Sequence, residues 1–393
     1  MIYLDNAATT WPKPEIVYRT MDTFMRNSGG NPGRGGHSMA EAANKVVDDT
    51  RLLLSRLINA PDTDRVIFTF NCTDSLNIGL KGLLKPGDHV ITSTIEHNSV
   101  IRPLEKLRHQ GIDITRVSPD PEYGYVLPDD IEKAITKKTK LIVMTHASNV
   151  NGIIQPAGEY GLLSREHNLI FMLDAAQTAG KYQLDVQTDN IDLLAFSGHK
   201  GLFGPPGTGG LYIGERVELD TLREGGTGSQ SELEEQPSQL PNRFESGTLN
   251  TAGIAGLGAG LRYIFEESTN KILGHEIRLT SRLIEGLSEI PGVTIYAASD
   301  IGRQCSVVSF TISDMEMGDV GTILDQAFDI KVRTGLHCAP SAHKTLGTFP
   351  RGTVRLSPGY FNTDEEIDVT LEAIERIAFS RGSVNKVEAG LKG

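Results

Sequence analysis

Short apolar runs alternate with helix-length amphipathic segments through the first two thirds of the chain. The apolar runs are RVIFTF (65–70), HVITST (89–94), LIVMTHA (141–147), LIFMLDAA (169–176) and LLAFSG (193–198). The segments between them include SLNIGLKGLL (75–84), VIRPLEKLRHQ (100–110) and GEYGLLSREHN (158–168). Runs that are apolar on both sides predict buried parallel strands with helices on both faces of the sheet. The alternation therefore predicts an α/β fold, in which ligands bind at the carboxyl ends of the strands.

The pattern changes after residue 225. The stretch GTGSQSELEEQPSQLPN (226–242) is polar and acidic and is predicted to be a long loop. The glycine-rich helical segment 252–267 then leads into a second domain. Its predicted elements are helices over 276–290 and 364–380 and strands over 293–298 and 306–312. We expect a large domain over 15–260 and a small domain formed by 1–14 and 261–393.

Composition narrows the class of protein. The chain has 393 residues, 38% of them hydrophobic and 22% charged, which is ordinary for a soluble globular protein with two domains. The first residues have neither the basic flank nor the apolar core of a signal peptide, and no apolar run approaches the length of a membrane span. Three widely spaced cysteines match neither a disulfide framework nor a zinc site. We expect a cytoplasmic protein that binds no metal, and the net charge of −12 argues against nucleic acid as a partner.

A lysine, Lys200, precedes a glycine-rich loop in AFSGHKGLFGPPGTGG (195–210). A phosphate-binding P-loop would need Lys and then Ser or Thr after its last glycine, and a helix after that. Gly210 and Leu211 occupy those two positions, and the following GLYIG is predicted to be a strand. The missing Lys and Ser/Thr pair argues against a nucleotide-binding role, which stays the weakest alternative, and Lys200 requires another explanation.

Asp174 and Lys200 each follow a predicted buried strand, so both can point into one cleft. This pair suits pyridoxal 5′-phosphate (PLP), whose aldehyde forms a Schiff base with a lysine and whose pyridinium nitrogen pairs with a carboxylate. Burial and nearby cations would lower the pKa of the lysine and make it a better base. The alternative, a structural ion pair, leaves Ser197 and His199 beside the lysine unexplained.

A phosphate site is indicated where the strand VIFTF runs into NCTDSLN (71–77) and a helix begins. Amides at a helix N-terminus bind anions, and Cys72 and Thr73 lie at this one. Ser197 and His199 can add hydrogen bonds to the same phosphate. Taken alone, Thr73 is equally well interpreted as a helix N-cap.

Seven motifs occur in one order along the chain: LDNAATT, EHNSV, SNVNG, LDAAQ, FSGHKGLFGPPGTG, RFESGTLNT and RTGLHCAP. Together they resemble fold-type I PLP enzymes of the class V aminotransferase group. More narrowly they resemble group II (SUF-type) cysteine desulfurases and the related selenocysteine lyases. The resemblance spans roughly residues 2 to 380. It implies a large domain with a mostly parallel seven-stranded sheet between helices, and a smaller α+β C-terminal domain.

The resemblance also implies roles for cofactor-site residues. His97 matches a histidine that stacks on the cofactor ring and shuttles protons. Asn149 matches a residue near the phenolic oxygen of PLP and the substrate carboxylate. Gln177 matches the hydrogen-bond partner of that oxygen. Thr248 matches a threonine that reaches the phosphate of the neighbouring subunit, which implies a homodimer with shared sites.

On the substrate side, Arg355 matches the arginine that clamps the substrate carboxylate, where a guanidinium can form two parallel hydrogen bonds. Arg333 and His37 are expected to contribute to the same substrate site. The cysteine Cys338 lies in RTGLHCAP, and positive charge from Arg333 and His337 would favour its thiolate.

Without its motif, Cys338 would be interpreted as a small buried hydrophobic residue. The resemblance instead makes it the residue that takes sulfur from L-cysteine as a persulfide, leaving L-alanine, before an acceptor protein collects the sulfur. His97 or His337 would move protons during the reaction. The thiols of Cys72 and Cys305 keep a structural interpretation, although Cys72 belongs to the expected cofactor surroundings.

Other functions remain open at this point. A selenocysteine lyase needs the same residues, and another class V aminotransferase or lyase needs most of them. A PLP-binding scaffold or regulator without catalysis is the non-enzyme alternative, and the full set of Asp174, Lys200, Arg355 and Cys338 argues against it. The short cysteine segment resembles group II, whereas the acidic loop 226–242 does not match the usual SUF-type sequence.

Overall fold

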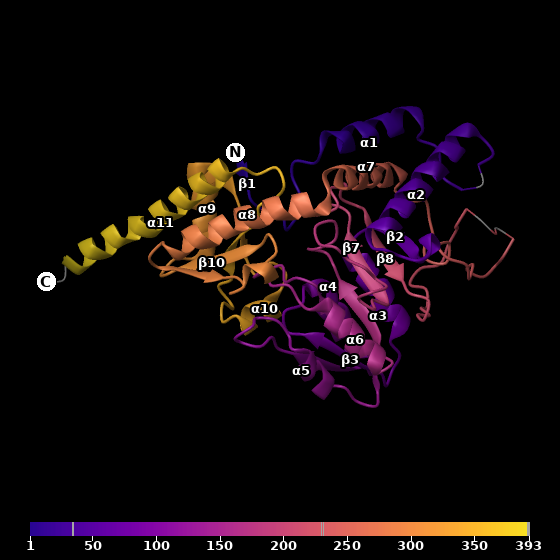
Figure 1. Cartoon of the computed structure of the whole chain (residues 1–393), viewed down its shortest axis with the longest axis horizontal. Coiled ribbons are helices and arrows are strands. Elements are labelled where there is room, and N and C mark those ends of the chain that lie inside the picture. Colours follow the sequence, from indigo (N-terminus) through magenta and orange to yellow (C-terminus); the bar gives the residue numbers. More distant parts are fainter. Residues whose placement is uncertain (34, 229, 231, 391–393) are drawn as a thin grey trace. The chain divides into compact units, whose positions relative to one another are not determined.

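The protein, as a computed structural model, is described over residues 1–33, 35–228, 230 and 232–390. It forms two compact units, whose elements are labelled in Figure 1. Unit 1 comprises Met1–Trp11, Ala147–Ile154 and Leu273–Gly393, and unit 2 comprises Pro12–His146 and Gln155–Ile272. Each unit has its own hydrophobic core. The division into domains at 15–260 against 1–14 and 261–393 stays a prediction.

Unit 2 is built on a seven-stranded sheet. In spatial order the strands are β2 (Val66–Thr69), β8 (Gly209–Ile213), β7 (Leu193–Ser197), β6 (Ile170–Asp174), β5 (Thr139–Thr145), β3 (His89–Ser93) and β4 (Asp113–Val117). The described pairings are parallel except those of β8, which is antiparallel to both β2 and β7. The predicted mostly parallel sheet is confirmed. Six of its strands, all but β4, are buried along most or all of their length, as expected for strands covered on both faces.

Helices cover this sheet (Figure 1). Those that follow its strands are α3 (Cys72–Leu83), α4 (Asn98–Arg108), α5 (Pro128–Lys133) and α6 (Ala157–Glu166). A second group comprises α1 (Glu15–Asn27), α2 (Ser38–Leu57) and α7 (Thr251–Glu267). The helix α7 packs against both α1 and α2. Its glycines permit this close packing, because a Cβ on Gly256 would lie 2.7 Å from Met21 Cγ.

Unit 1 contains a four-stranded antiparallel sheet. Its strands, in spatial order, are β12 (Arg333–Gly335), β13 (Thr353–Leu356), β10 (Val308–Ile312) and β9 (Val293–Tyr296). The N-terminal strand β1 (Ile2–Tyr3) pairs in parallel with β11 (Ile330–Lys331). Its helices are α9 (Met317–Phe328), α10 (Pro340–Thr345), α11 (Asp364–Gly390) and all but the first four residues of α8 (Thr269–Ser288). The predicted α+β character of the C-terminal part is confirmed.

The segment Ala147–Ile154 leaves unit 2 after β5 and becomes part of unit 1. It is held there by backbone pairing, since Cys305 N donates to Gly152 O at 2.8 Å. The hydroxyl of Ser309 also donates to Val150 O at 2.5 Å. Asn149, which follows a strand of the large sheet in sequence, therefore belongs to the smaller unit.

Two sequence expectations concern segments at the surface. The loop prediction for 226–242 is confirmed for its described residues, which form neither helix nor strand, and Ser229 and Ser231 lie outside the described residues. The predicted helix over 364–380 is longer in the structure, because α11 extends to Gly390.

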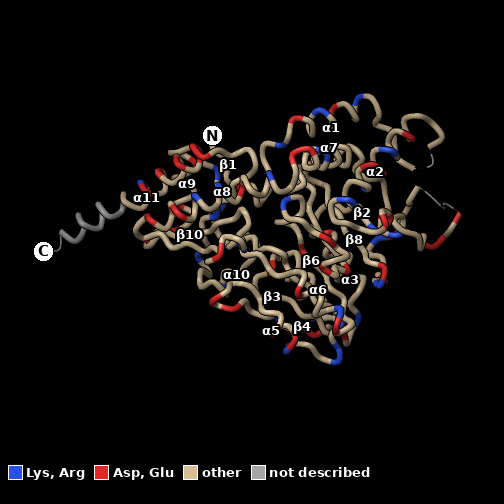
Figure 2. Tube along the Cα trace, viewed as in Figure 1, with Lys and Arg blue, Asp and Glu red and all other residues tan. Residues whose placement is uncertain are grey.

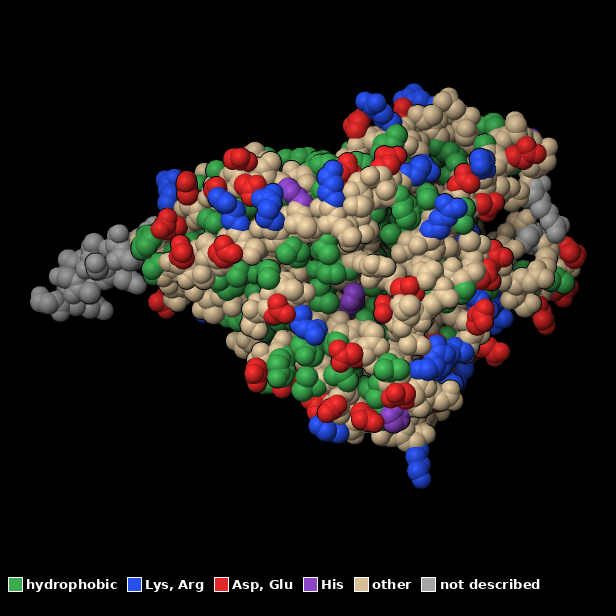
Figure 3. Space-filling view, in the orientation of Figure 1, with side chains coloured by type: hydrophobic (Ala, Val, Ile, Leu, Met, Phe, Trp, Pro, Cys, Tyr) green, Lys and Arg blue, Asp and Glu red, His purple; other side chains and the backbone are tan. Residues whose placement is uncertain are grey.

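Lys and Arg residues are interspersed with Asp and Glu along the trace (Figure 2). On the face shown in Figure 3, basic side chains likewise alternate with acidic ones and do not merge into a broad basic surface. This mixture fits the net charge of −12. In the part of the chain that the structure describes, no helix is both long and apolar enough to cross a membrane.

Candidate active site

Polar side chains meet at the carboxyl ends of β6 and β7 in unit 2. Asp174 is the last residue of β6 and is buried, and its Oδ1 accepts hydrogen bonds from Ala176 N at 2.9 Å and Cys72 Sγ at 3.2 Å. Ser197 is the last residue of β7, and its Oγ accepts from Cys72 N at 3.1 Å. The start of α3 is thereby fixed against the ends of both strands.

The charge of Lys200 acts on this cluster. The pKa of the Cys72 thiol is raised well above its ordinary value, first by burial and then by the negative charge and hydrogen bond of Asp174. The positive charge of Lys200 opposes that rise. Cys72 therefore stays a protonated donor to Asp174, which agrees with its structural interpretation.

The first turn of α3 has its own N-cap. Asn71, not Thr73, caps the helix, because Asn71 Oδ1 accepts from Asp74 N at 3.0 Å. Thr73 is the second helical residue, and no described residue accepts a hydrogen bond from its amide. Gly209, from the glycine-rich segment, packs closely against this first turn, since a Cβ on Gly209 would lie 2.6 Å from Asn71 Cα. Only glycine lets β8 approach the start of α3 this closely.

A second lysine lies beside the Lys200 segment. Lys13 Nζ donates to His199 O at 2.7 Å, and burial lowers the pKa of Lys13 to about 8. Burial, followed by the charges of Lys200 and Lys13, lowers the pKa of His199 to about 4. His199 is therefore neutral at pH 7. The motifs did not mark Lys13, although its place in TTWPKPE, between two prolines, is unusual for a surface lysine.

Glu96 and His97 lie at the carboxyl end of β3. Glu96 is fully buried, and its Oε1 accepts from Ser93 Oγ at 2.5 Å and from Thr145 N at 3.0 Å. Burial is the main reason that the pKa of Glu96 rises to about 8, and the charge of Asp174 adds to it. His97 caps α4, and its Nδ1 accepts from Ser99 N at 3.0 Å. In the neutral imidazole the proton is therefore on Nε2.

Unit 1 gathers a different set of predicted residues. Arg355 is buried, with Nη1 donating to Asn149 O at 3.0 Å and Nη2 to Asp5 Oδ1 at 2.7 Å. Arg333 lies 3.6 Å from the other oxygen of Asp5. The side chain of Asn149 donates to His337 O at 2.7 Å. The structure thus brings Arg355, Arg333 and Asn149 together, and it adds Asp5, whose motif carried no predicted role.

His337 and Cys338 follow β12. His337 is buried, and burial followed by the charge of Arg355 lowers its pKa to about 2. The expectation that His337 supplies positive charge to Cys338 is therefore wrong, because its imidazole is neutral at any physiological pH. The Cys338 thiol is exposed, whereas Cys305 is buried.

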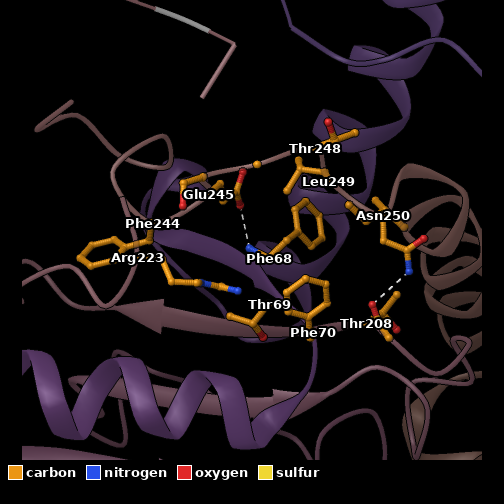
Figure 4. Close-up of a pocket in the computed structure, with 14 residues that line it drawn as sticks. Phe68, Thr69, Phe70, Thr208, Arg223, Phe244, Glu245, Thr248, Leu249 and Asn250 are labelled. Atoms are coloured by element: carbon orange, nitrogen blue, oxygen red, sulfur yellow. Dashed lines mark hydrogen bonds between the residues drawn. The ribbon is translucent and has the colours of Figure 1, made fainter. Parts of the chain in front are cut away.

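The remaining predicted residues are Gln177, His37 and Thr248. Gln177 is half-buried just after β6. His37 is exposed and caps α2 through Ala40 N, 3.3 Å from its Nδ1. Thr248 is exposed on the loop before α7 and lines a pocket with Phe68, Phe70 and Leu249 (Figure 4).

A buried ion pair anchors the loop that carries Thr248. Arg51 on α2 binds both carboxylate oxygens of Glu245, at 2.7 and 2.9 Å. The same carboxylate accepts from Phe68 N at 2.7 Å, the contact drawn in Figure 4. Helix, strand and loop are thereby joined at one carboxylate three residues before Thr248.

Comparison with known proteins places these features in context. The family model for class-V aminotransferases matches residues 2–370. A probable cysteine desulfurase of Methanothermobacter thermautotrophicus is 38% identical over 96% of this chain and 94% of its own length. A solved apo cysteine desulfurase from Thermococcus onnurineus is 35% identical with a TM-score of 0.89, covering 96% of this chain and 95% of that one. A cysteine desulfurase from Escherichia coli is 28% identical with a TM-score of 0.85, over 95% and 94% of the two chains.

Proposed function

The chain belongs to the class-V aminotransferase family, and from that premise we propose that it is a PLP-dependent cysteine desulfurase. It would convert L-cysteine to L-alanine and hold the sulfur as a persulfide on Cys338. The structure supports the proposal through the combination of two features, one in each unit. The buried carboxylate of Asp174 accepts from Cys72, whose pKa responds to the charge of Lys200, and the exposed thiol of Cys338 lies between β12 and β13, the strand that carries Arg355.

The residues of unit 2 fit PLP. Asp174 has the burial and charge that a pyridinium nitrogen requires, and Lys200 would form the Schiff base. The Thr73 amide has no hydrogen-bond partner among described residues, and with Ser197 and the neutral His199 it would bind the phosphate. When bound, PLP would draw electrons from the substrate Cα and make its proton acidic.

Other residues would orient the cofactor and move protons. Gln177 would donate to the phenolic oxygen, and His97 would cover the ring. With Nδ1 engaged at the helix start, His97 presents Nε2–H as its donor. Lys200 would take the proton from the substrate Cα as general base.

Residues of unit 1 would bind the substrate. Arg355 would clamp the carboxylate, with Arg333 and Asn149 beside it, and His37 is proposed for the same site. The Cys338 thiolate would attack the substrate sulfur, forming an S–S bond and breaking the Cβ–S bond. The electron pair of that bond stays on Cβ, which takes a proton to become the alanine methyl group. L-Cysteine and the Cys338 thiol thus yield L-alanine and a Cys338 persulfide.

We further propose a cytoplasmic homodimer in which Thr248 contacts the phosphate of the partner's cofactor. The exposed position of Thr248 beside an apolar pocket supports this arrangement. An acceptor protein or a thiol reductant would then remove the sulfur from Cys338.

The test is product formation from L-cysteine in the presence of a thiol reductant. Wild type should release alanine and sulfide in equal amounts, and Cys338→Ala should release neither at a comparable rate. Cys305→Ala, which removes a buried thiol, is the matched control and should retain activity. A keto acid in place of alanine would identify a transaminase. Selenide release from L-selenocysteine by Cys338→Ala, without activity on L-cysteine, would identify a selenocysteine lyase.

A further inference from the structure

The turn that carries Cys338 has an unfavourable backbone. Ala339 N donates to Leu336 O at 2.8 Å, which closes a four-residue turn. Its two central residues, His337 and Cys338, have φ of 47° and 58°. Positive φ at both central positions defines a type I′ turn, which normally takes Asn and Gly. Histidine and cysteine have a Cβ that opposes this conformation, so other contacts must hold it.

Those contacts converge on His337. Its Nε2 lies 2.8 Å from Thr353 Oγ1, and its carbonyl accepts from Asn149 Nδ2 at 2.7 Å. The ring lies 5.4 Å from that of His343, centroid to centroid, and is buried. The imidazole is thus buried and bound to the Thr353 hydroxyl, which we call the anchor of the turn. The next side chain, Cys338, is exposed.

The anchor lies on the strand that also carries the carboxylate clamp. Thr353 and Arg355 are two residues apart on β13, so their side chains lie on the same face. Both are fully or almost fully buried. The charge of Arg355 acts on the His337 ring, which agrees with their proximity. One face of β13 therefore carries both the guanidinium of Arg355 and the hydroxyl that binds the turn at His337.

We propose that His337 is a positioning residue, whose contact with Thr353 presets the turn that presents the Cys338 thiol at a fixed spacing from Arg355. The inference rests on the proposed function for the meaning of that spacing. When Arg355 binds the carboxylate of L-cysteine, the substrate sulfur on Cβ then faces the Cys338 thiol, which the turn already holds in position. His337 transfers no proton, and its neutral ring acts through its contact with Thr353 and its packing against His343.

The first test removes the hydroxyl of Thr353 and leaves His337 unchanged. Thr353→Val replaces the hydroxyl by a methyl group of similar size, and Thr353→Ser is the matched control that keeps the hydroxyl. We expect Thr353→Val to lower kcat for alanine formation at least tenfold, with KM for L-cysteine within twofold of wild type, because Arg355 is untouched. Thr353→Ser should retain kcat within about twofold. Equal kcat in Thr353→Val and wild type would overturn the proposal, as would loss in the serine variant alone.

A second variant tests the role of the ring. His337→Asn tolerates positive φ but is too short to reach Thr353. It should lower kcat at all pH values without altering the shape of the pH profile. Loss of one limb of that profile would show that His337 transfers a proton, and the positioning role would then be wrong.

A third measurement does not depend on catalysis. Amide hydrogen exchange of the peptide containing Ala339 should be faster in Thr353→Val than in wild type and unchanged in Thr353→Ser. Unchanged exchange in both variants would refute the anchor. If wild type makes no alanine from L-cysteine while the exchange result holds, the proposed function fails and the anchored turn stands.

Discussion

The half-buried amine of Lys13 lies beside the carbonyl of His199, one residue before Lys200. Its pKa of about 8 means that it is mostly charged at neutral pH and loses its charge just above. A positive charge near a protonated Schiff base favours loss of the Schiff-base proton. Lys13 therefore gives the Lys200 site a cationic neighbour that its motif does not contain.

We expect Lys13→Met to raise the pKa of the Lys200 Schiff base by about one pH unit. Titration of its visible absorbance measures that pKa, and Lys13→Arg, which keeps the charge, should leave it near the wild-type value. The absorbance difference between Lys13→Met and wild type should fade above pH 8, where Lys13 itself becomes neutral. Identical titrations of all three proteins would show that Lys13 does not act on this site.

Glu96 makes stability depend on pH. Its ordinary pKa of 4.5 rises to about 8 in the folded protein, so between these values the folded state keeps a proton that the unfolded state releases. The free energy of unfolding should therefore fall as pH rises through this window, by up to about 1.4 kcal/mol per pH unit. Glu96→Gln does not titrate and should lack this slope. Urea denaturation of both proteins at pH 5.5, 7 and 8.5 measures the difference, and parallel pH dependences would contradict it.

Motifs identified the chemically distinctive residues but not those whose properties depend on burial. Lys200 and Asp174 follow recognisable strands, and their types alone indicate the chemistry. Lys13, Glu96 and Asp5 are ordinary charged residues in the sequence. Their roles depend on neighbours distant along the chain, as with Asp5 and Arg355. The same reason explains the error on His337, whose burial no local pattern reveals.

At the scale of elements, the ion pair of Arg51 and Glu245 joins α2, β2 and the loop before α7. Both side chains are almost completely buried. Removing one partner would leave the other charge without compensation in a medium that solvates it poorly. The pair therefore matters more for the arrangement of these elements than surface ion pairs do.

We expect Arg51→Met to lower the free energy of unfolding by roughly 3–5 kcal/mol, because a buried carboxylate is left unpaired. The double variant Arg51→Met with Glu245→Gln should lose less, since glutamine is neutral and keeps an acceptor for Phe68 N. Chemical denaturation of the two variants and wild type tests this order. A double variant less stable than Arg51→Met would show that the charge is not the cause.

Strand positions were predictable because the buried runs stand out from their surroundings. The structure confirms β3, β5, β6 and β7 close to the predicted ranges. Burial patterns do not report strand direction, so the antiparallel β8 was not foreseen. The N-cap of α3 was assigned to Thr73 in one interpretation, although Asn71 is an equally good capping residue two positions earlier.

At the scale of the whole molecule, the proposed dimer makes a complementation experiment possible. Lys200→Ala lacks the Schiff-base lysine, and Thr248→Glu would place a carboxylate against the partner's phosphate. A mixed dimer would contain one site with native Lys200 and native Thr248. Refolding the two variants together should restore about a quarter of wild-type activity, since half of the dimers are mixed and each has one intact site.

Neither variant alone should show that activity, and the mass in solution should be that of a dimer by sedimentation. Activity equal to the sum of the separate variants would mean that Thr248 acts within its own subunit. A monomeric wild type with full activity would remove the shared-site arrangement altogether.

The excursion of Ala147–Ile154 into unit 1 has a consequence for synthesis on the ribosome. Its backbone and side-chain partners, Arg303 to Ser309, emerge roughly 150 residues later. At about 5–20 residues per second this segment waits roughly 8–30 s without its neighbours. Nascent chains stalled before residue 303 should therefore be cleaved by protease near 150, and those stalled after unit 1 has emerged should be protected.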